Sequence, residues 1–155
     1  MKNAIDMLGT IGSKAKIAPT ASGARRVRGS AELLEQEALI QWAALTVIKG
    51  YRVGDYLVHV PNEGKRGPKA ASEFKRAGGR AGYPDLILDL PAGDWHGLRI
   101  EMKSRDGKPT ATQLEWIERL RGAGYRAEVC YGFEDARNVI TEYLAQGNSI
   151  RLSGA

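Results

Sequence analysis

The sequence predicts an α/β fold in which a mixed β-sheet is flanked by α-helices. Residues 84–90 and 98–103 alternate between apolar and charged side chains on either side of a turn-rich segment, which indicates a β-hairpin. Residues 98–131 then have the order strand, helix, strand, which favours a right-handed crossover and a parallel pair of strands. With 155 residues, the chain is long enough for one sizeable core.

The individual elements follow from local signals. Ser30 can cap a helix that ends at Gly50, because apolar residues recur between them at helical spacing. Glycines, prolines and the change from helical to alternating periodicity mark the other boundaries. The expected elements are helices over 31–49, 69–77, about 111–121 and about 134–145, and strands over 56–60, 84–90, 98–103 and 126–131.

A hairpin centred on Asp94 sorts its side chains onto two faces. Its register would pair Leu86 with Met102, and Asp85 with Lys103. One face then carries only apolar side chains that can pack against a core. The other face carries the charged side chains, which are Asp85, Asp89, Arg99, Glu101 and Lys103.

This register gathers two carboxylates and one ammonium. Close carboxylates repel each other unless a cation sits between them or one of them takes up a proton. Mg²⁺ prefers oxygen ligands and keeps several waters, so two carboxylates together with substrate phosphate oxygens suit it well. An ammonium beside them can orient a nucleophile or neutralise charge that develops on a phosphate. The same pattern also fits an ordinary hairpin with a solvated charged face, in which Asp85 and Lys103 form a cross-strand ion pair.

Charge is distributed unevenly along the chain. Residues 1–29 contain six Lys and Arg against one Asp, which gives +5, the formal net charge of the whole chain. We expect a flexible basic arm over 1–29, which either follows nucleic-acid phosphates or is a solvated leader without a role. A folded domain follows over 30–146, and the tail over 147–155 has no clear assignment. A second basic cluster, which we expect to contact phosphates, contains Lys65, Arg66, Lys69 and Arg80.

Several classes of protein are excluded by what the sequence lacks. No apolar run approaches the roughly 20 residues that a membrane helix needs, and the N-terminus has no signal-peptide core, so we expect a cytoplasmic protein without a membrane partner. The lone Cys130 excludes an intramolecular disulfide. Together with His59 and His96 it gives too few ligands for a zinc finger, and we interpret it as a buried small side chain.

Four stretches in order carry a resemblance to a known family. They are 59–66, 79–85, 100–103, and Gln113 with Trp116 and Leu120. They resemble the PD-(D/E)XK nucleases and, within them, a stand-alone VRR-NUC domain of phage or bacterial type over about residues 30–146. The resemblance implies a restriction-endonuclease-like core and metal-dependent cleavage of DNA, with a preference for branched DNA such as four-way (Holliday) junctions. It also implies a homodimer, since small stand-alone members act on junctions as pairs, and a location in a bacterium or a phage-infected bacterium.

The resemblance also implies roles for individual residues. Mg²⁺ or Mn²⁺ would be bound by Asp85, Glu101 and the backbone carbonyl of Met102, while Lys103 positions the attacking water. In related nucleases an acid on the first helix completes the metal site. Glu32, with Gln36 four residues later, matches that pattern best and Glu35 is the alternative, although an acid near a helix N-terminus is favourable in any protein.

The remaining candidates have two interpretations each. Gln113 is implied to support Lys103 or the water, but Thr110 to Gln113 also fits a capping box. His59, Asn62 and Glu63 lie in a matching stretch and are candidates to line the DNA cleft, although a loop histidine is usually incidental.

The predicted function is a Mg²⁺- or Mn²⁺-dependent, structure-selective DNA endonuclease. One alternative is a sequence-specific restriction-like endonuclease, which shares the core, but the chain leaves little room for a base-reading module. The other is a non-catalytic DNA-binding protein on a nuclease scaffold. A decayed site typically loses the lysine or an acid, whereas this sequence keeps them all. No other protein partner can be inferred.

Overall fold

The structure, a computed structural model, describes residues 21–62 and 66–147. Residues 1–20 of the predicted arm, the candidates Glu63 and Lys65, and the tail from 148 onward lie outside the described residues. The elements are α1 (Ala21–Leu45), β1 (Val47–Ile48), β2 (Tyr51–Arg52), the 3-10 helix η1 (Val53–Asp55), β3 (Leu57–His59), α2 (Pro68–Arg76), β4 (Leu86–Leu88), β5 (Leu98–Lys103), α3 (Ala111–Gly122), β6 (Arg126–Tyr131) and α4 (Phe133–Ala145).

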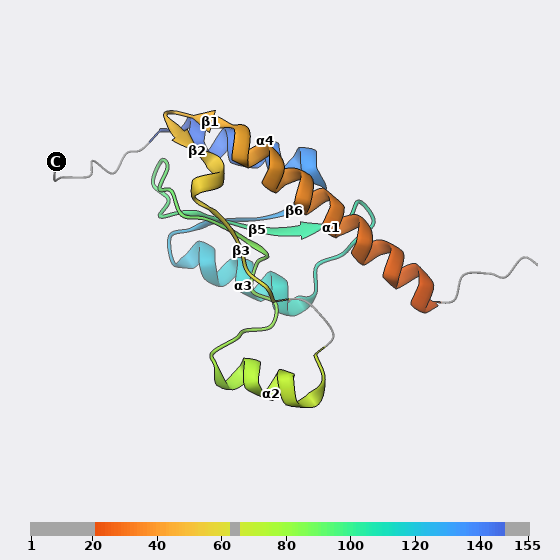
Figure 1. Ribbon diagram of the computed structural model, residues 1–155. Coiled ribbons are helices and arrows are strands. Elements are labelled where there is room, and N and C mark those ends of the chain that lie inside the picture. Colours follow the sequence, from red (N-terminus) through yellow and green to blue (C-terminus); the bar gives the residue numbers. More distant parts are fainter. Residues whose placement is uncertain (1–20, 63–65, 148–155) are drawn as a thin grey trace, which may run out of the picture.

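The main sheet has four strands in the order β3, β4, β5 and β6. Strand β4 is antiparallel to both of its neighbours, β3 and β5, whereas β5 and β6 are parallel and are connected through α3. The predicted fold class, a mixed sheet flanked by helices, is therefore confirmed. Figure 1 shows this sheet at the centre, with α1 and α4 on one side and α3 on the other.

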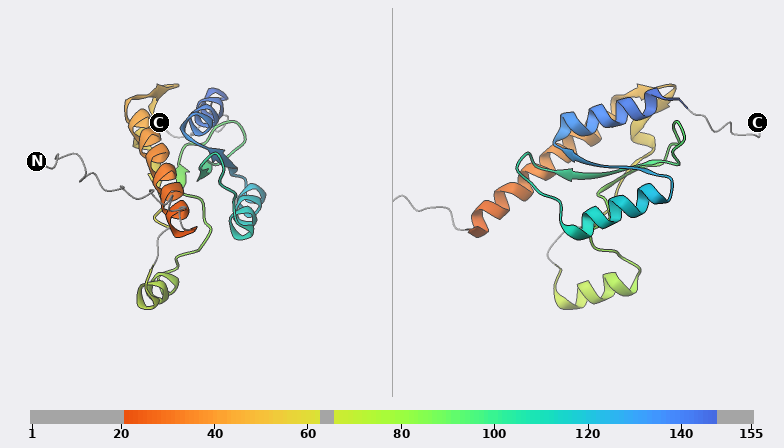
Figure 2. Two further views of the ribbon diagram at one scale, coloured as in Figure 1. Left: turned by 90° about the vertical axis from the view of Figure 1, so that its right-hand side faces the viewer. Right: turned by 180° about the vertical axis from the view of Figure 1, so that it is seen from behind.

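Two hydrophobic clusters hold the layers together. The larger cluster joins the apolar face of the sheet to α1 and α4, for example through Leu39, Ile100 and Tyr143. The smaller one packs α3 against β6 through Ile117, Leu120 and Ala127. The second view in Figure 2 shows the same three layers from behind. The charged face of the hairpin therefore lies under α3 and is mostly not solvated.

The hairpin of β4 and β5 has the predicted faces but a different register. Leu88 pairs with Leu98, two residues away from the predicted partner Ile100. At the tip of the hairpin, Ala92 pairs with Trp95. Between this pair and the Leu88–Leu98 pair, the segment after β4 has one more residue than the segment before β5. The segment after β4 contains Pro91, which has no N–H for a regular ladder. A shift of two residues keeps every side chain on its predicted face, but it places Asp85 opposite Glu101 rather than opposite Lys103.

The predicted boundaries of the first helix are wrong. Helix α1 begins at Ala21, so Ser30 lies inside it and residues 21–29 of the predicted arm are helical. Arginine and alanine are frequent in this segment and are good helix formers. The helix ends at Leu45, because Val47 and Ile48 pair with β2 in a small hairpin that the sequence did not lead us to expect. Its turn places Lys49 and Gly50 at positive φ, the combination that a tight hairpin requires.

Helix α2 belongs to a long excursion between β3 and β4. It begins with Pro68 and has no buried residue, and it stands apart from the sheet in all three views of Figures 1 and 2. The strands on both sides of the excursion are nevertheless hydrogen-bonded neighbours, with His59 opposite Leu86. Both ends of the excursion are therefore fixed at the same end of the sheet.

Candidate active site

Asp85 is held at the point where the excursion returns to the sheet. The residue is 6% exposed, and its Oδ2 accepts a hydrogen bond of 2.9 Å from the backbone N–H of Met102 on β5. Its carbonyl accepts the N–H of Val60 at 2.7 Å, at the end of β3. The preceding loop approaches α3 closely, because Gly82 has φ +78° and a Cβ there would lie 2.8 Å from Thr112 Cγ2. The position of this carboxylate is thus fixed from three sides.

Glu101 and Lys103 form a buried ion pair on β5. They are 0% and 6% exposed, and Lys103 Nζ lies 2.6 Å from Glu101 Oε1. Lys103 Nζ also donates to the carbonyl of Met102 at 2.9 Å. Residues two apart on a strand point to the same face, which explains why the pair forms along the strand. The predicted alternative, a solvated face with an Asp85–Lys103 cross-strand pair, is not what the structure shows.

The surroundings of Lys103 favour its charged form. Burial alone lowers the pKa of an ammonium, but the hydrogen bond to Glu101 and the negative charges of Glu101, Glu32 and Asp85 act in the opposite direction and prevail. The pKa of Lys103 is therefore raised above its ordinary value. At neutral pH this side chain is an ammonium that donates hydrogen bonds, and it is not a base.

Gln113 satisfies both interpretations of its position at once. The N–H of Gln113 donates to Thr110 Oγ1 at 3.3 Å, and the N–H of Thr110 donates to Gln113 Oε1 at 2.8 Å, which completes a capping box at the start of α3. The free end of the same amide, Nε2, donates to Glu101 Oε1 in a short hydrogen bond. The cap therefore fixes the orientation of the amide that contacts the buried carboxylate.

The two candidate acids on α1 have different positions. Glu32 Oε1 lies 3.7 Å from Lys103 Nζ and accepts the backbone N–H of Ser104 at 3.1 Å. Glu35 points elsewhere, since its Oε2 accepts the N–H of Phe133 at 2.7 Å at the start of α4. An acid at that position stabilises the helix N-terminus. The structure thus brings Glu32, and not Glu35, to the cluster around Lys103.

The predicted cleft residues lie near the site but do not join the cluster. His59 is exposed at the end of β3, and its Nδ1 lies 3.2 Å from Gln36 Nε2 on α1. Asn62 donates from Nδ2 to the carbonyl of Tyr83 at 2.9 Å. This bond links the start of the excursion to the segment that precedes Asp85.

The predicted phosphate contacts fall into two groups. Lys69 and Arg80 are exposed, as a phosphate contact requires. Arg66 is engaged within the protein, because its guanidinium donates to the carbonyls of Pro61 and Asn62 at 2.8 and 3.2 Å.

The oxygen donors at the ends of β4 and β5 fit a hard divalent cation in their chemistry. Two carboxylates, Asp85 and Glu101, and the carbonyl of Met102 lie at one end of the sheet. Among the described residues, no group of three or more His, Cys, Asp and Glu side chains forms a ready-made metal site. Mg²⁺ commonly uses only one or two carboxylates and takes its other ligands from water and substrate phosphate. The donor set therefore fits a cation that is bound jointly by protein and substrate.

Sequence reasoning missed Ser104 and Phe74. The backbone N–H of Ser104 fixes Glu32, and a backbone contact gives no signal in the sequence. Phe74 on α2 lies under the guanidinium of Arg66, whose carbon is 3.9 Å from the ring centroid. The i and i+8 spacing of an arginine and a phenylalanine across a helix start has no standard sequence signature.

Comparisons with known proteins agree with this geometry. The family model of the VRR-NUC domain matches residues 31–134. A solved structure described as "VRR_NUC domain protein" is 38% identical, with a TM-score of 0.68 over 76% of this chain and 91% of that chain. A search of curated protein sequences gave no significant match.

These findings define a nuclease domain. The chain belongs to the VRR-NUC family, which confirms the resemblance predicted from the sequence. Nucleases of this family act on DNA and generally depend on a divalent metal. Within the part of the chain that the structure describes, no helix has the length and apolarity needed to cross a membrane.

Proposed function

We propose that this protein is a Mg²⁺- or Mn²⁺-dependent endonuclease that hydrolyses phosphodiester bonds in branched DNA, such as four-way (Holliday) junctions. The observation that carries the proposal is the cluster at the end of the sheet, in which Lys103 is buried among Glu101, Glu32 and Asp85. Such a group of charges is costly to bury, so a merely structural role would be better served by apolar side chains. A buried lysine with a perturbed pKa, surrounded by acidic side chains, is typical of a functional site.

Asp85, Glu101 and the carbonyl of Met102 are the residues that would hold the metal ion. When bound, the ion would neutralise charge on the scissile phosphate and make water a better nucleophile. Glu101 receives hydrogen bonds from Lys103 and Gln113, so its carboxylate is oriented before substrate arrives. Preorganisation of this kind lowers the cost of reaching the transition state.

Lys103 is the proposed catalytic residue that touches the reacting atoms. Its raised pKa keeps it protonated, so Nζ can hold the attacking water by donating a hydrogen bond and can offset negative charge on the phosphate. Gln113 and Glu32 act as positioning residues, because they contact Glu101 and Lys103 respectively.

The exposed cations of the excursion are the proposed contacts to DNA phosphates. Lys69 and Arg80 face solvent on either end of α2, and the excursion ends directly at Asp85. Contacts of this kind position a duplex without reading its sequence. They therefore support a structure-selective enzyme over the alternative of a sequence-specific restriction-like endonuclease.

A homodimer is the proposed assembly, because a four-way junction has approximate two-fold symmetry and each chain supplies one site. The outer face of α1 supports it, since Leu33, Leu34, Ile40 and Leu45 are exposed there, Leu45 by 88%. Trp42 and Trp116 pack against the two hydrophobic clusters and do not belong to this face.

Light scattering at micromolar concentration, with and without junction DNA, would test the assembly. We expect a dimer that Ile40→Glu disrupts, while the control Leu114→Glu, at an exposed leucine of α3, leaves it intact. A monomer under both conditions, combined with junction cleavage, would rule out the dimer.

The activity itself is tested with supercoiled, linear and four-way-junction DNA in Mg²⁺, in Mn²⁺ and in EDTA. We expect cleavage only with a divalent ion and fastest on the junction. DNA binding without cleavage in every ion would favour the remaining alternative, a non-catalytic DNA-binding protein. Equal cleavage of the three DNA forms would remove the proposed structure selectivity.

A further inference from the structure

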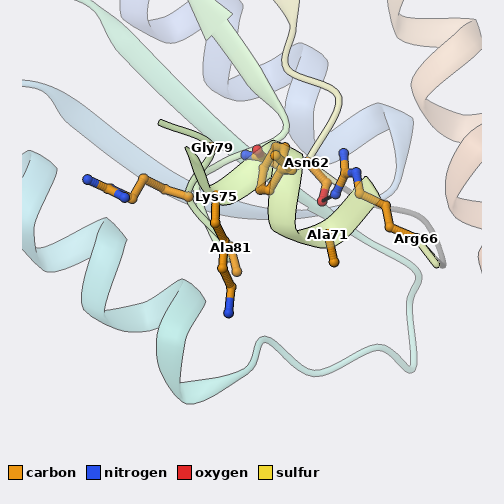
Figure 3. Close-up of a pocket in the computed structure, with 8 residues that line it drawn as sticks. Asn62, Arg66, Ala71, Lys75, Gly79 and Ala81 are labelled. Atoms are coloured by element: carbon orange, nitrogen blue, oxygen red, sulfur yellow. Dashed lines mark hydrogen bonds between the residues drawn. The ribbon is translucent and has the colours of Figure 1, made fainter. Parts of the chain in front are cut away.

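A pocket of about 560 Å³ lies between α2 and the loops that flank it. Its described lining residues are Asn62, Arg66, Ala71, Phe74, Lys75, Gly79, Arg80 and Ala81. Figure 3 shows these side chains around the helix, with Asn62 and Arg66 coming from the loop that precedes it and Gly79 and Ala81 from the loop that follows. The volume is within the roughly 300–1,000 Å³ that is usual for sites of small organic groups.

One wall of this pocket is a planar cation supported by an aromatic ring. The guanidinium of Arg66 lies over the ring of Phe74 at 3.9 Å, and its two carbonyl partners at Pro61 and Asn62 prevent rotation. The ring itself is packed against Gly79, where a Cβ would collide with it. Arg66 is therefore held over the ring before any ligand binds, and a planar guanidinium in a fixed position is a surface on which nucleobases stack.

The pocket is also positively charged. Its described lining contains three cationic side chains, Arg66, Lys75 and Arg80, and no carboxylate. None of the ion pairs among the described residues involves Lys75 or Arg80. Uncompensated cations around an apolar floor suit a ligand that is both planar and attached to phosphates.

The pocket is connected to the candidate active site by short, defined contacts. Asn62 in its wall is hydrogen-bonded to the carbonyl of Tyr83, two residues before Asp85. The carbonyl of Ala81 accepts the indole N–H of Trp116 on α3 at 3.2 Å. A group bound in the pocket would therefore lie at a fixed position relative to the catalytic carboxylates.

We propose that this pocket binds an unstacked nucleobase of the DNA substrate, on the plane formed by Arg66 and Phe74. The inference deepens the proposed nuclease function, on which it rests, by naming the feature of branched DNA that the enzyme recognises. A fully paired duplex keeps its bases stacked and offers the pocket only phosphates. A branch point, bulge or flap has bases that can leave the stack at low cost, so the pocket distinguishes these DNAs from a continuous duplex.

The test is a binding measurement in EDTA, where cleavage does not interfere. Fluorescence anisotropy would compare a paired duplex, the same duplex with a short unpaired stretch, and that unpaired stretch made of abasic residues. The abasic probe keeps the phosphates and the flexibility but lacks the base. We expect the wild-type protein to bind the base-containing stretch at least about five-fold more tightly than the abasic one, the lower end of what stacking of one base contributes.

Two pairs of variants separate the base from the charge. Ala71→Leu fills the pocket without changing charge, and Ala70→Leu is its control, because Ala70 lies on the same helix but does not line the pocket. Arg66→Lys keeps the charge but removes the plane, and Arg76→Lys is its control outside the pocket. In Ala71→Leu and Arg66→Lys, the ratio of the affinities for the base-containing and the abasic stretch should fall to about one. The two controls should keep the wild-type ratio. Circular dichroism would verify the fold of each variant.

The proposal is overturned if the wild-type protein binds base-containing and abasic stretches equally, or if folded Ala71→Leu keeps the full preference. Displacement of the DNA by micromolar dAMP would assign the pocket to a free nucleotide and would overturn it as well. Cleavage of DNA by the wild-type protein in Mg²⁺ is measured separately. The nuclease activity and the base pocket can therefore fail independently of each other.

Discussion

The end of the sheet and the α2 excursion are built in opposite ways. At the end of the sheet, Asp85, Glu101 and Lys103 are almost completely buried. Hydrogen bonds from β5 and α3 and the ion pair with Glu32 of α1 hold their polar groups. On the excursion, Lys69, Lys75 and Arg80 are exposed. The described part of the chain thus has a buried charge cluster at the end of its sheet and exposed cations, the proposed DNA contacts, on a segment that stands apart from the sheet.

This difference follows from what each task requires. Catalysis needs donors that are already oriented, because reorientation during the reaction would cost free energy. Attraction of a polyanion needs charges that remain hydrated and accessible until counterions are released. Substitutions in the two regions should therefore have different consequences, and the following predictions use this contrast.

Among substitutions outside the two metal-binding carboxylates, Lys103→Ala is expected to have the largest effect on cleavage. Loss of a preorganised donor to the reacting phosphate typically costs about 100- to 1,000-fold in rate. DNA affinity should change little, because the side chain is buried. Single-turnover cleavage with saturating DNA would measure the rate, with Lys108→Ala, an exposed lysine of the following loop, as the control. A folded Lys103→Ala variant that cleaves at the wild-type rate would remove Lys103 from the mechanism.

The largest effect on stability is expected from Glu101→Ala. The substitution leaves the ammonium of Lys103 without its nearest partner, and breaking a buried pair in this way costs about 3–5 kcal/mol. The double variant Glu101→Ala/Lys103→Met should recover much of that loss, since no unpaired charge remains. Urea denaturation would give the free energies of unfolding. If Glu101→Ala is as stable as wild type, the pair makes no contribution to stability.

The excursion should show the opposite behaviour. Replacing Lys69, Lys75 and Arg80 by alanine should leave the unfolding temperature unchanged and weaken binding to every DNA sequence. The slope of log K against log salt should fall by about 0.9 for each phosphate contact that is lost on duplex DNA. Titrations at several salt concentrations would measure it. An unchanged slope would exclude these side chains from the DNA contact.

The two acids of α1 test the contrast within one helix. Glu35→Ala should cost about 1 kcal/mol of stability, because its carboxylate caps α4, and cleavage should be retained. Glu32→Ala should lower the cleavage rate at little cost in stability, because it loses the contact with Lys103. Thermal unfolding and cleavage assays on both variants would show whether Glu35→Ala affects mainly stability and Glu32→Ala mainly the cleavage rate. The reverse result would make Glu35 the active-site acid.

The smallest effect is expected from the titration of Cys130, which is buried in the larger hydrophobic cluster. Burial, followed by the negative charges of Asp135 and Glu128, raises its pKa to about 12. In the unfolded chain the pKa of this thiol is about 8.5. Because the folded pKa is higher, the buried neutral thiol makes its full contribution to stability below pH about 8.5, and this contribution is lost as the pH rises toward about 12. A thiol reagent at mildly alkaline pH should label it in concentrated guanidinium but not in the folded protein. Rapid labelling of the folded protein would show that this layer opens readily.

Much of the fold could be predicted because its signals are local. Strand β6 has the predicted bounds, and the two faces of the hairpin follow from alternation alone. The register of the hairpin does not follow from alternation, because it depends on the backbone conformation of Pro91 and the residues at the tip. The start of α1 was missed since a serine before an apolar stripe is a good cap signal, yet the helix simply continues through it.

For the site, the residues on one strand were the easiest to predict. The spacing of Glu101 and Lys103 places them on the same face whatever the register. By contrast, the choice between Glu32 and Glu35 depends on how α1 packs against β5 and α4. Glu32 is 72 residues from its partner Ser104, and Glu35 is 98 residues from its partner Phe133. The stacking of Arg66 on Phe74 likewise requires the path of a loop that has no sequence signature.

The central claim is that Asp85 and Glu101 form the metal-dependent centre for DNA cleavage. The most direct test is the single-turnover rate on a four-way junction for Asp85→Asn and Glu101→Gln, which preserve shape while removing one carboxylate charge each. We predict that neither variant forms product in Mg²⁺ or Mn²⁺, although both remain folded and bind the junction with wild-type affinity in EDTA. Cleavage by either folded variant at a rate close to that of wild type would contradict this account.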